Sequence, residues 1–427
     1  MSKVNENRPG YKETKVGWIP EEWSITSLGE VSDYINGRGF KPYEWGEEGL
    51  PIIRIQNLNG SNEFNYYSGE YNPKLLVLDN ELLFAWSGSR GSSFGPHIWK
   101  GGKGLLNYHT WKVQVFHSVV KNYLFYSLSL LTSIIEDDAH GQAALVHIQK
   151  QFIKKYRIPL PPLPEQKKIA QILSSWDQAI EKLERLIELK ELRKKGLMQL
   201  LLTGKKRLPE HSPFIQPQKA IPSSWKKTRL KDATIDIIRR NTTGSRHVLT
   251  ASGTSGLVDQ KEYFNRSIAA SDLGNYLLLK KGEFAYNRSS MKGYPFGAIK
   301  RLEKYDEGVL STLYMCFSCV SEKLDPAYAN EYFESGLCNG QLNGRVQVGA
   351  RAHGLLNISK KDFYGIELSI PGLDEQKAIV RVANNLTNEL KAHRRVLDAV
   401  KTQKKGLMQK LLTGEIRVKV TEEDYAE

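Results

Sequence analysis

The sequence predicts an α+β fold in which two globular heads of mixed α/β character are separated by two long helices that pair as an antiparallel coiled coil. A repeat is the main observation: the segment from Pro161 to Gly204 returns from Pro371 to Gly414 at a constant offset of 210 residues, with 17 of 44 paired positions identical. A fixed-period repeat sets the architecture before any local assignment. A weaker second repeat relates Gly17–Leu28 to Lys219–Leu230 through a shared Ile-Pro-x-x-Trp. The chain is therefore expected to have an internal pseudo-two-fold repeat.

Each copy of the strong repeat has the apolar spacing of a coiled-coil seam, with alternating steps of four and three residues. The predicted seam residues are Ile169, Leu173, Trp176, Ile180, Leu183, Ile187, Leu197 and Leu201 in the first copy, and Ile379, Ala383, Leu386, Leu390, Leu397, Val400, Leu407 and Leu411 in the second. The seam is interrupted at Lys190, Lys194, His393 and Lys404. We expect the two helices to pair antiparallel within one chain; the alternative is a seam between two copies of the chain.

The ends of both helices carry matching signals. Glu165 and Glu375 stand in the first turn, where the helix dipole favours a carboxylate. Each helix ends at a Thr-Gly pair, because glycine readily adopts the left-handed cap. Gly196 and Gly406 lie inside the helical pattern, where a glycine costs about 1 kcal/mol relative to alanine. We expect close approach of the partner helix at these two glycines; a local kink is the alternative.

These boundaries divide the chain into five parts. They are a first head at 1–160, a first helix at 161–207, a proline-rich linker with the second head at 208–370, a second helix at 371–418 and a tail at 419–427. At 427 residues, a prior of roughly 150 residues per domain also predicts two to three units.

Bulk composition excludes several classes of protein. No apolar run approaches the roughly 20 residues of a membrane span, and the polar start MSKVNENRPGYKETKVGW is unlike a secretory signal. The three cysteines are too few, and odd in number, for a disulfide framework. We therefore expect a cytoplasmic protein without membrane contact.

The net charge of +14 predicts a polyanionic partner, and its distribution narrows that prediction. Residues 165–207 hold 11 Lys/Arg against 6 Asp/Glu, and residues 375–417 hold 10 against 4. The helices thus carry most of the excess charge, while the heads hold basic residues in local clusters. This pattern favours selective contacts over general binding of phosphates.

Loops of both heads combine basic, amide and aromatic side chains. LLFAWSGSRGSSFG in the first head resembles EFAYNRSSMKGYPFG in the second, and both predict a strand that runs into a polar loop. Arg and Lys can bind guanine, and Asn and Gln can bind adenine, through paired hydrogen bonds in the major groove. A solvated surface loop is the alternative for any one of them. The candidate DNA-binding residues are Arg38, Lys41, Arg54, Gln56, Asn57, Trp86, Ser89, Arg90, His140, Gln142, Arg239, Arg240, Asn241, Arg246, Asn287, Arg288, Lys292, Arg345, Gln347, Arg351 and His353.

Motifs for catalysis are missing from the sequence. We find neither the Gly-x-x-x-x-Gly-Lys-Ser/Thr phosphate loop nor the Asn-Pro-Pro-aromatic tetrapeptide of amino-methyltransferases. The nine histidines form no evident nucleophile–base constellation. Cys316 and Cys319 lie in the apolar run LYMCFSCV, which predicts a core strand and no metal site. We expect a protein that reads a ligand without its own chemistry.

The segments YKETKVGWIPEEW, LLFAWSGSRG, IPLPPLPEQKKIA and the doubled KKGLMQxLLTG together resemble the specificity subunit of a type I restriction-modification system. The second junction departs from the first at Pro371-Gly-Leu-Asp374. The resemblance implies that each head is a target recognition domain for half of a bipartite DNA site and that the helices set the gap between the halves. It also implies two adenine methyltransferase subunits and motor-nuclease subunits as partners, with S-adenosylmethionine, ATP and Mg²⁺ bound by those subunits.

By the same resemblance, residues of the junctions and helices would dock the methyltransferases or serve as spacer. They are Leu163, Glu165, Gln166, Ile169, Leu173, Trp176, Ile180, Leu183, Ile187, Leu197, Leu373, Glu375, Gln376, Ile379, Leu386, Leu390, Leu397 and Leu407.

Three other functions compete with this interpretation. A stand-alone sequence-specific DNA-binding regulator would need no methyltransferase, but near-neutral heads disfavour strong unaided binding. A coiled-coil scaffold explains the helices and leaves the loop-rich heads unexplained. A free-standing nuclease or methyltransferase is opposed by the missing motifs.

Overall fold

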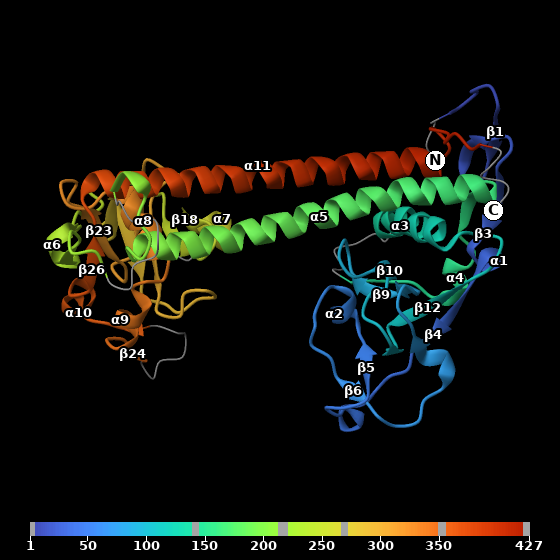
Figure 1. Ribbon diagram of the computed structural model, residues 1–427, viewed down its shortest axis with the longest axis horizontal. Helices are drawn as coiled ribbons and strands as arrows, with labels where there is room; N and C mark the ends of the chain where they lie inside the picture. Colours follow the sequence, from blue (N-terminus) through green and yellow to red (C-terminus); the bar gives the residue numbers. More distant parts are fainter. Residues whose placement is uncertain (1–4, 139–144, 212–220, 266–271, 349–355, 422–427) are drawn as a thin grey trace. The chain divides into compact units, whose positions relative to one another are not determined.

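The computed structural model describes residues 5–138, 145–211, 221–265, 272–348 and 356–421 (Figure 1). The chain divides into two compact units: unit 1 comprises Met1–Glu184 and Arg395–Glu427, and unit 2 comprises Arg185–Arg394. Among the described helices, none combines the length and the apolar character that a bilayer span requires.

Two helices of equal length form the frame of both units. Helix α5 spans Leu163–Leu202 and helix α11 spans Leu373–Leu412, each 40 residues, and both contribute one part to each unit. In unit 1, Asp177 pairs with Lys404, and Glu184 pairs with Lys401 at 2.7 Å. Since residue numbers rise along α5 as they fall along α11, the two helices run antiparallel.

The same order of pairing holds in unit 2, where Lys190 pairs with Glu389 and Lys194 donates to the Thr387 hydroxyl at 2.7 Å. The predicted antiparallel pairing is therefore confirmed. Three of the four polar interruptions of the seam, Lys190, Lys194 and Lys404, are the residues that bind across it. The predicted apolar seam residues are all buried or half-buried.

Both glycines inside the helices are exposed, and a Cβ added at Gly196 or Gly406 would meet nothing within 4 Å. The predicted close approach of the partner helix at these positions is wrong. The helices continue through both residues. The predicted glycine caps are confirmed, because Gly204 and Gly414 have φ of +71° and +70° directly after the last turns.

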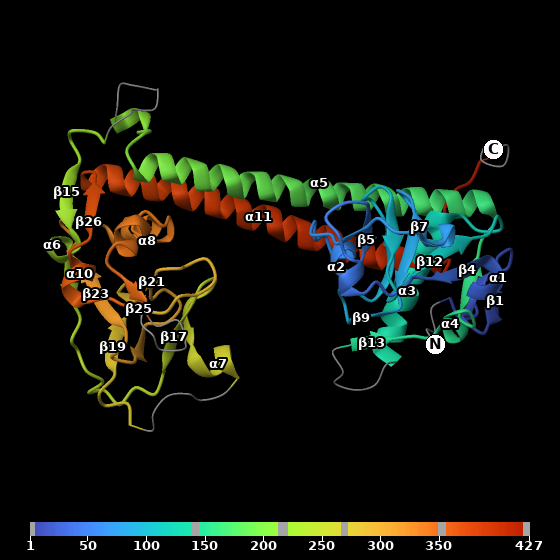
Figure 2. The same ribbon diagram turned by 90° about the horizontal axis from the view of Figure 1, so that it is seen from below.

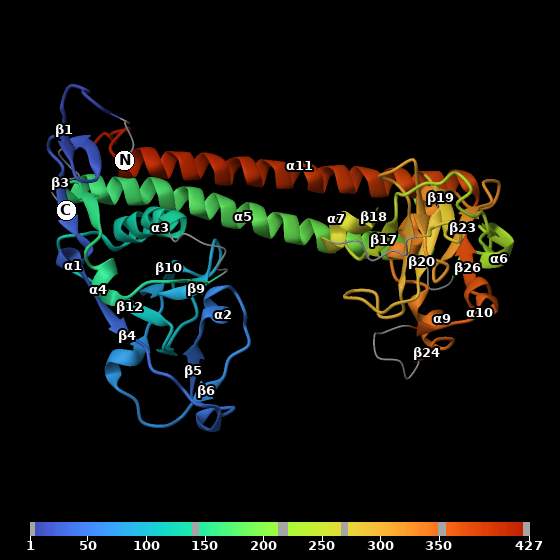
Figure 3. The same ribbon diagram turned by 180° about the vertical axis from the view of Figure 1, so that it is seen from behind.

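Unit 1 contains a four-stranded sheet of order β10-β8-β12-β4 and a second sheet of order β6-β5-β11-β7. Its strands are β1 Tyr11–Thr14, β2 Gly17–Pro20, β3 Ser24–Ser27, β4 Ser32–Asn36, β5 Leu50–Ile53, β6 Tyr66–Tyr67, β7 Leu76–Val77, β8 Leu82–Ala85, β9 Ser87–Ser89, β10 Gly95–Ile98, β11 Gly104–Leu106, β12 Thr110–Val115, β13 Leu145–His147 and β14 Arg157–Leu160. Its helices besides the long pair are α1 Leu28–Val31, η1 Pro42–Glu44, α2 Ile55–Leu58, η2 Pro73–Leu75, α3 Lys121–Asp138 and α4 Lys150–Ile153. Helix α3 lies between β10 and α5 (Figure 3), and the Tyr126 hydroxyl of α3 donates to Asp177 of α5 at 2.7 Å.

Unit 2 contains a four-stranded sheet of order β21-β20-β23-β16. Its strands are β15 Lys226–Arg229, β16 Thr234–Asp236, β17 Leu249–Ser252, β18 Gly256–Asp259, β19 Leu277–Lys280, β20 Phe284–Asn287, β21 Ala298–Arg301, β22 Glu307–Leu310, β23 Met315–Cys319, β24 Gln347–Val348, β25 Leu356–Asn357 and β26 Glu367–Ile370. Its helices besides the long pair are η3 Pro209–His211, α6 Leu230–Ala233, α7 Gln260–Phe264, α8 Pro326–Glu334, α9 Asn339–Asn343 and α10 Lys360–Tyr364. Strands β15 and β26 lie side by side (Figure 2), as β3 and β14 do in unit 1.

The two four-stranded sheets have the same order, since β4, β8, β10 and β12 correspond to β16, β20, β21 and β23. In each, the central strand is fully apolar: Leu82–Ala85 and Phe284–Tyr286 are all buried. The predicted strand before each Gly-rich loop is confirmed, and so is the core position of Cys316 in β23, where burial raises the pKa of the thiol to about 12. The repeat seen in the sequence is thus a repeat of topology.

Candidate nucleic-acid interface and helix junctions

A buried carboxylate closes the junction between the first head and α5. Glu165, 2% exposed, accepts from Trp23 Nε1 at 2.8 Å and from the Arg417 guanidinium at 2.7 and 3.1 Å. Trp23 belongs to the Ile-Pro-x-x-Trp motif, and Arg417 follows the glycine cap of α11. Hydrogen bonding to Glu165 raises the pKa of Arg417 well above its usual value. Three sequence signals that are far apart in the chain therefore meet at one carboxylate.

Unit 2 repeats this junction with its own residues. Glu375, 5% exposed, accepts from Arg207 Nε and Nη2 at 2.7 and 2.6 Å and from Trp225 Nε1 at 3.3 Å. The glycine caps pack on the prolines of the same motif, because a Cβ on Gly204 or Gly414 would lie 2.4 Å from a Pro222 or Pro20 carbon. We call each Trp–Glu–Arg cluster a junction latch.

The glutamine beside each latch carboxylate fixes the start of the helix. Gln166 accepts from the Val120 amide at 2.8 Å and donates to the Pro161 carbonyl at 2.8 Å. Gln376 accepts from the Asp325 amide and donates to the Pro371 carbonyl, at 2.8 and 2.9 Å. Both amides are at most 1% exposed. The side chains of both predicted Glu-Gln docking pairs therefore form hydrogen bonds within the chain. They would influence the binding of a partner only by holding the junction in shape.

Most of the candidate DNA-binding arginines already have partners within their own head. Six are held by an oxygen atom of another residue: Arg38 by Glu44, Arg90 by Glu136, Arg239 by Glu283, Arg240 by Asn275, Arg288 by Leu313 and Arg345 by Asp362. These bonds fix the direction of the side chains. They also lower the number of donors that each arginine can offer to a ligand.

Two of the predicted base-reading amides are hydrogen-bonded within their own loops. Asn57 is 6% exposed and binds the Ser61 and Glu63 carbonyls at 3.0 and 2.9 Å. Asn241 is 7% exposed, donates to the Ser245 carbonyl at 2.8 Å and accepts from its amide at 2.9 Å. Both amides hold their loops in shape and offer no free edge to DNA.

The other candidates divide by exposure. Exposed candidates are Lys41, Gln56, Ser89, Arg246 and Lys292, whereas Arg54, Trp86 and Asn287 are half-buried. The candidates His140, Gln142, Arg351 and His353 lie outside the described residues, as does the side chain of Gln347. The structure therefore leaves a smaller set of side chains that can contact a ligand.

A cleft in unit 1 brings two of them, Arg54 and Gln56, together with aromatic residues that the sequence prediction missed. It measures about 340 Å³ and is lined by Trp45, Arg54, Gln56, Asn107, Tyr108 and His109 among others. Trp45 and Tyr108 are 37% and 48% exposed, which is unusual for large aromatic side chains. The sequence offered one signal for them. Trp45 follows Pro42 and Tyr108 precedes β12, so both lie in turns, where aromatic side chains are not required for the core.

Comparison with known proteins agrees with this architecture. The family model of the type I restriction modification DNA specificity domain matches residues 20–191. The MjaVIII type I restriction enzyme specificity subunit of Methanocaldococcus jannaschii is 30% identical over 424 residues, which covers 94% of each chain. The chain belongs to the family of type I restriction enzyme specificity subunits.

Two further similarities are more limited. The EcoBI specificity subunit of Escherichia coli is 26% identical over 228 residues, 50% of this chain and 47% of that one. A solved structure, described as the structural basis of complex assembly and conformational transition of the type I R-M system, has a TM-score of 0.51 at 13% identity and covers 93% of this chain and 99% of that one. The latter similarity shows a shared fold.

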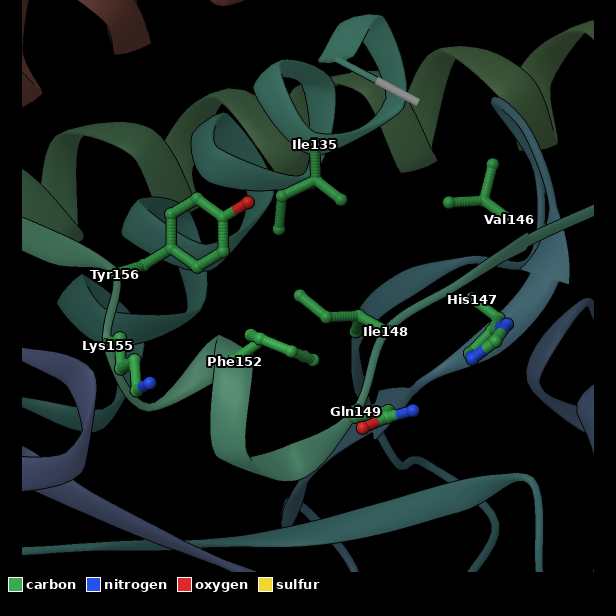
Figure 4. A pocket seen from close by; sticks show the side chains of 8 residues that line it. All are labelled: Ile135, Val146, His147, Ile148, Gln149, Phe152, Lys155 and Tyr156. Atoms are coloured by element: carbon green, nitrogen blue, oxygen red, sulfur yellow. The ribbon is translucent and has the colours of Figure 1, made fainter. Parts of the chain in front are cut away.

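This specificity subunit also has a pocket of about 540 Å³ in unit 1, lined by both apolar and polar side chains (Figure 4). Ile135 of α3 points toward Ile148, and Phe152 of α4 lies below them, with Tyr156 at the other side. Phe152 is 50% exposed. The pocket adjoins α3, β13 and α4, and the described residues that line it supply one charged group, Lys155.

The long helices of the specificity subunit expose leucines that the seam prediction did not include. Leu186, Leu189 and Leu192 of α5 are 38%, 47% and 58% exposed in unit 2. Their spacing of three residues places them along one side of the helix, outside the seam. The sequence signal was available, since these leucines lie between seam positions in an otherwise charged segment.

Proposed function

We propose that this chain is the DNA sequence-recognition subunit of a type I restriction-modification complex, in which each head is a target recognition domain for one half of a bipartite DNA site. One observation carries the proposal: both units are built on the same sheet order and the same junction latch, yet their loops differ in sequence. A common scaffold with different loops suits two reading surfaces with different targets. The half-sites are accordingly expected to differ.

In this proposal the helices have two tasks. Each has 40 residues, which corresponds to a length of about 60 Å, and the pair would fix the unread gap between the half-sites. The exposed leucines 186, 189 and 192 support docking of a protein partner on α5, because apolar rows in a charged surface mark protein–protein contacts. The expected partners are two adenine methyltransferase subunits and the motor-nuclease subunits.

The chemistry would belong to those partners. S-adenosylmethionine, ATP and Mg²⁺ are expected on the methyltransferase and motor-nuclease subunits, and this chain would supply recognition only. With double-stranded DNA as the ligand, the expected location of the complex is the cytoplasm.

The test is a map of methylated adenines across the genome of cells with and without this gene, in the presence of the methyltransferase partner. The expected result is a gene-dependent motif of two parts separated by a fixed gap. The absence of gene-dependent methylation, where the methyltransferase is shown to be expressed, would contradict the proposal. Binding of the purified chain alone to one specific duplex would then favour the stand-alone regulator.

Docking on α5 has a separate test. Leu189→Lys places a charge in the exposed apolar row without touching the seam, and it should weaken co-purification with the methyltransferase. The matched control is Glu188→Lys, because Glu188 is a neighbouring exposed residue whose ion pair among the described residues is with Arg185 of the same helix. Equal co-purification of the wild type and both variants would contradict docking at this row.

A further inference from the structure

The cleft in unit 1 is built from three separate turns of the head. Trp45 follows η1, Arg54 lies between β5 and α2, and Tyr108 and His109 lie between β11 and β12. The paired strands β5 and β11 bring the last two turns together, since Leu106 lies opposite Ile53 in a parallel ladder. The cleft is therefore positioned by a sheet and not by the loops alone.

The side chain of Arg54 combines three features. It is half-buried, its Nε is buried without a hydrogen-bond partner, and no carboxylate among the described residues pairs with it. Its guanidinium lies 5.3 Å from the centre of the Trp45 ring, an arrangement typical of cation–π contact. By contrast, Arg38 in the same head is paired with Glu44. The Trp45 ring orients the Arg54 side chain, and no side chain or carbonyl among the described residues accepts a hydrogen bond from its guanidinium.

A second unpartnered polar atom lines the same cleft. Nδ1 of His109 is buried without a hydrogen-bond partner. The imidazole lies 3.7 Å from the Tyr108 ring and 5.3 Å from the Trp86 ring, measured between centroids. Partial burial lowers the pKa of His109 and favours the neutral form of the ring. Buried polar groups without partners are rare and costly, and two in one cleft indicate that a polar ligand completes the site.

The chemistry of the lining selects among anionic and aromatic ligands. Arg54 is the one permanently charged side chain among the described residues that line the cleft, and aromatic rings surround it. A phosphate site would be expected to combine several cations or backbone amides. A planar ligand edge with two acceptors suits a single oriented guanidinium better, and guanine presents O6 and N7 in this way in the major groove, whereas adenine presents only N7 as an acceptor there.

We propose that Arg54 is a specificity-determining residue that binds the edge of one guanine in the half-site read by unit 1, with Trp45 holding the guanidinium plane. The proposal rests on the function proposed above. Arg54 would donate two parallel hydrogen bonds to O6 and N7 of that base. His109 and Gln56 lie in the same cleft and would contact the neighbouring base pair or its bridging water.

The experiment uses the full chain in complex with its methyltransferase partner. Methylation rates are measured on duplexes that carry the wild-type motif and on duplexes with each base pair of the motif replaced in turn. For the wild type, one G·C pair in the half-site of unit 1 should be required. For Arg54→Ala, discrimination at that one pair should fall by about 5- to 150-fold, while every other position keeps its preference.

Three further variants separate the possible outcomes. Arg54→Lys keeps the charge but loses the fork of donors, so it should also lose discrimination at this pair. Arg301→Ala is the matched control, because Arg301 lies in unit 2 and is already paired with Glu303 at 2.6 Å. Trp45→Leu should reduce the same discrimination less strongly than Arg54→Ala does.

Each result has a distinct meaning. Absence of any motif for the wild type would contradict the function proposed above. If the wild type has a motif and Arg54→Ala leaves it unchanged, the guanine assignment is overturned and Arg54 makes no contact with DNA. If Arg54→Ala lowers the methylation rate equally at all positions and Arg54→Lys restores it, the assignment is also overturned and Arg54 contacts a phosphate. Should Arg54→Ala unfold, as its melting curve would show, Arg54→Lys decides the question alone.

Discussion

The junction latch of unit 2 should be one of the strongest single contributions to the stability of that unit. The Glu375 and Arg207 side chains are 6% and 17% exposed, and two hydrogen bonds of 2.7 and 2.6 Å join them. Removing one partner of a buried pair typically costs about 3–5 kcal/mol, because the other charge stays buried without compensation. Glu375→Gln keeps the shape and removes the charge. Since Arg207 retains some contact with water, we expect a loss of about 3 kcal/mol.

The assay is urea unfolding followed by fluorescence, with a double-mutant cycle over Glu375→Gln and Arg207→Met. The expected coupling energy is at least about 2 kcal/mol. The control is Glu303→Gln, which breaks an exposed pair with Arg301 and should cost less than about 1 kcal/mol. The reasoning is refuted if Glu375→Gln costs no more than this control, or if the two latch substitutions are additive.

Three other predictions concern stability. Gly196→Ala and Gly406→Ala should each raise the free energy of unfolding by up to about 1 kcal/mol, since the added methyl meets open space. A lower free energy of unfolding in denaturant titrations would contradict this. Lys300 is 4% exposed and donates to Glu334 at 2.7 Å, so Lys300→Met should destabilise unit 2 by about 2–4 kcal/mol, and an unchanged unfolding midpoint would contradict that. Burial lowers the pKa of His97, so on acidification the unfolded chain binds a proton before the folded chain does. The free energy of unfolding should therefore fall by up to about 1.4 kcal/mol per pH unit as the pH drops below about 6.5. In melting curves, His97→Gln should reduce this dependence on pH.

The sequence was sufficient for the frame of the molecule because the frame is periodic. Seam spacing, first-turn carboxylates and Thr-Gly caps are local signals, and each helix has the predicted cap. The repeat added the one long-range fact that periodicity cannot supply, namely that both halves share a topology. The expected antiparallel pairing followed from the repeat, because two helices that each follow a similar head must run back past each other to pair within one chain.

The candidate site was predicted less well, because residue type does not show which partners a side chain meets. Asn57 and Asn241 have the composition of base-reading residues but serve as internal braces of their loops. Arg239 is occupied by Glu283, which lies 44 residues away in the chain. Arg54 has the same chemistry, and no carboxylate among the described residues pairs with it. The difference is set by tertiary packing, which no local pattern in the sequence records.

The predicted roles of Gly196 and Gly406 failed for a related reason. Glycine at the same position of both helices indicates that both copies need a small residue there. It does not show whether that residue faces the partner helix or the exposed side. Both glycines lie on the exposed side, so contacts within the described chain do not explain them.

The latches also indicate the order in which the two units can complete their structure. Unit 2 is a continuous segment, and its latch joins residues 168 apart. Unit 1 is discontinuous, and its latch joins Glu165 to Arg417 across 252 residues. In unit 1, moreover, Leu411 and Leu412 of α11 are buried in the same core as Trp23 and Leu173. The first head therefore lacks part of its core until the end of the chain is present. The same latch chemistry closes one continuous segment in unit 2 and joins two separate segments of the chain in unit 1.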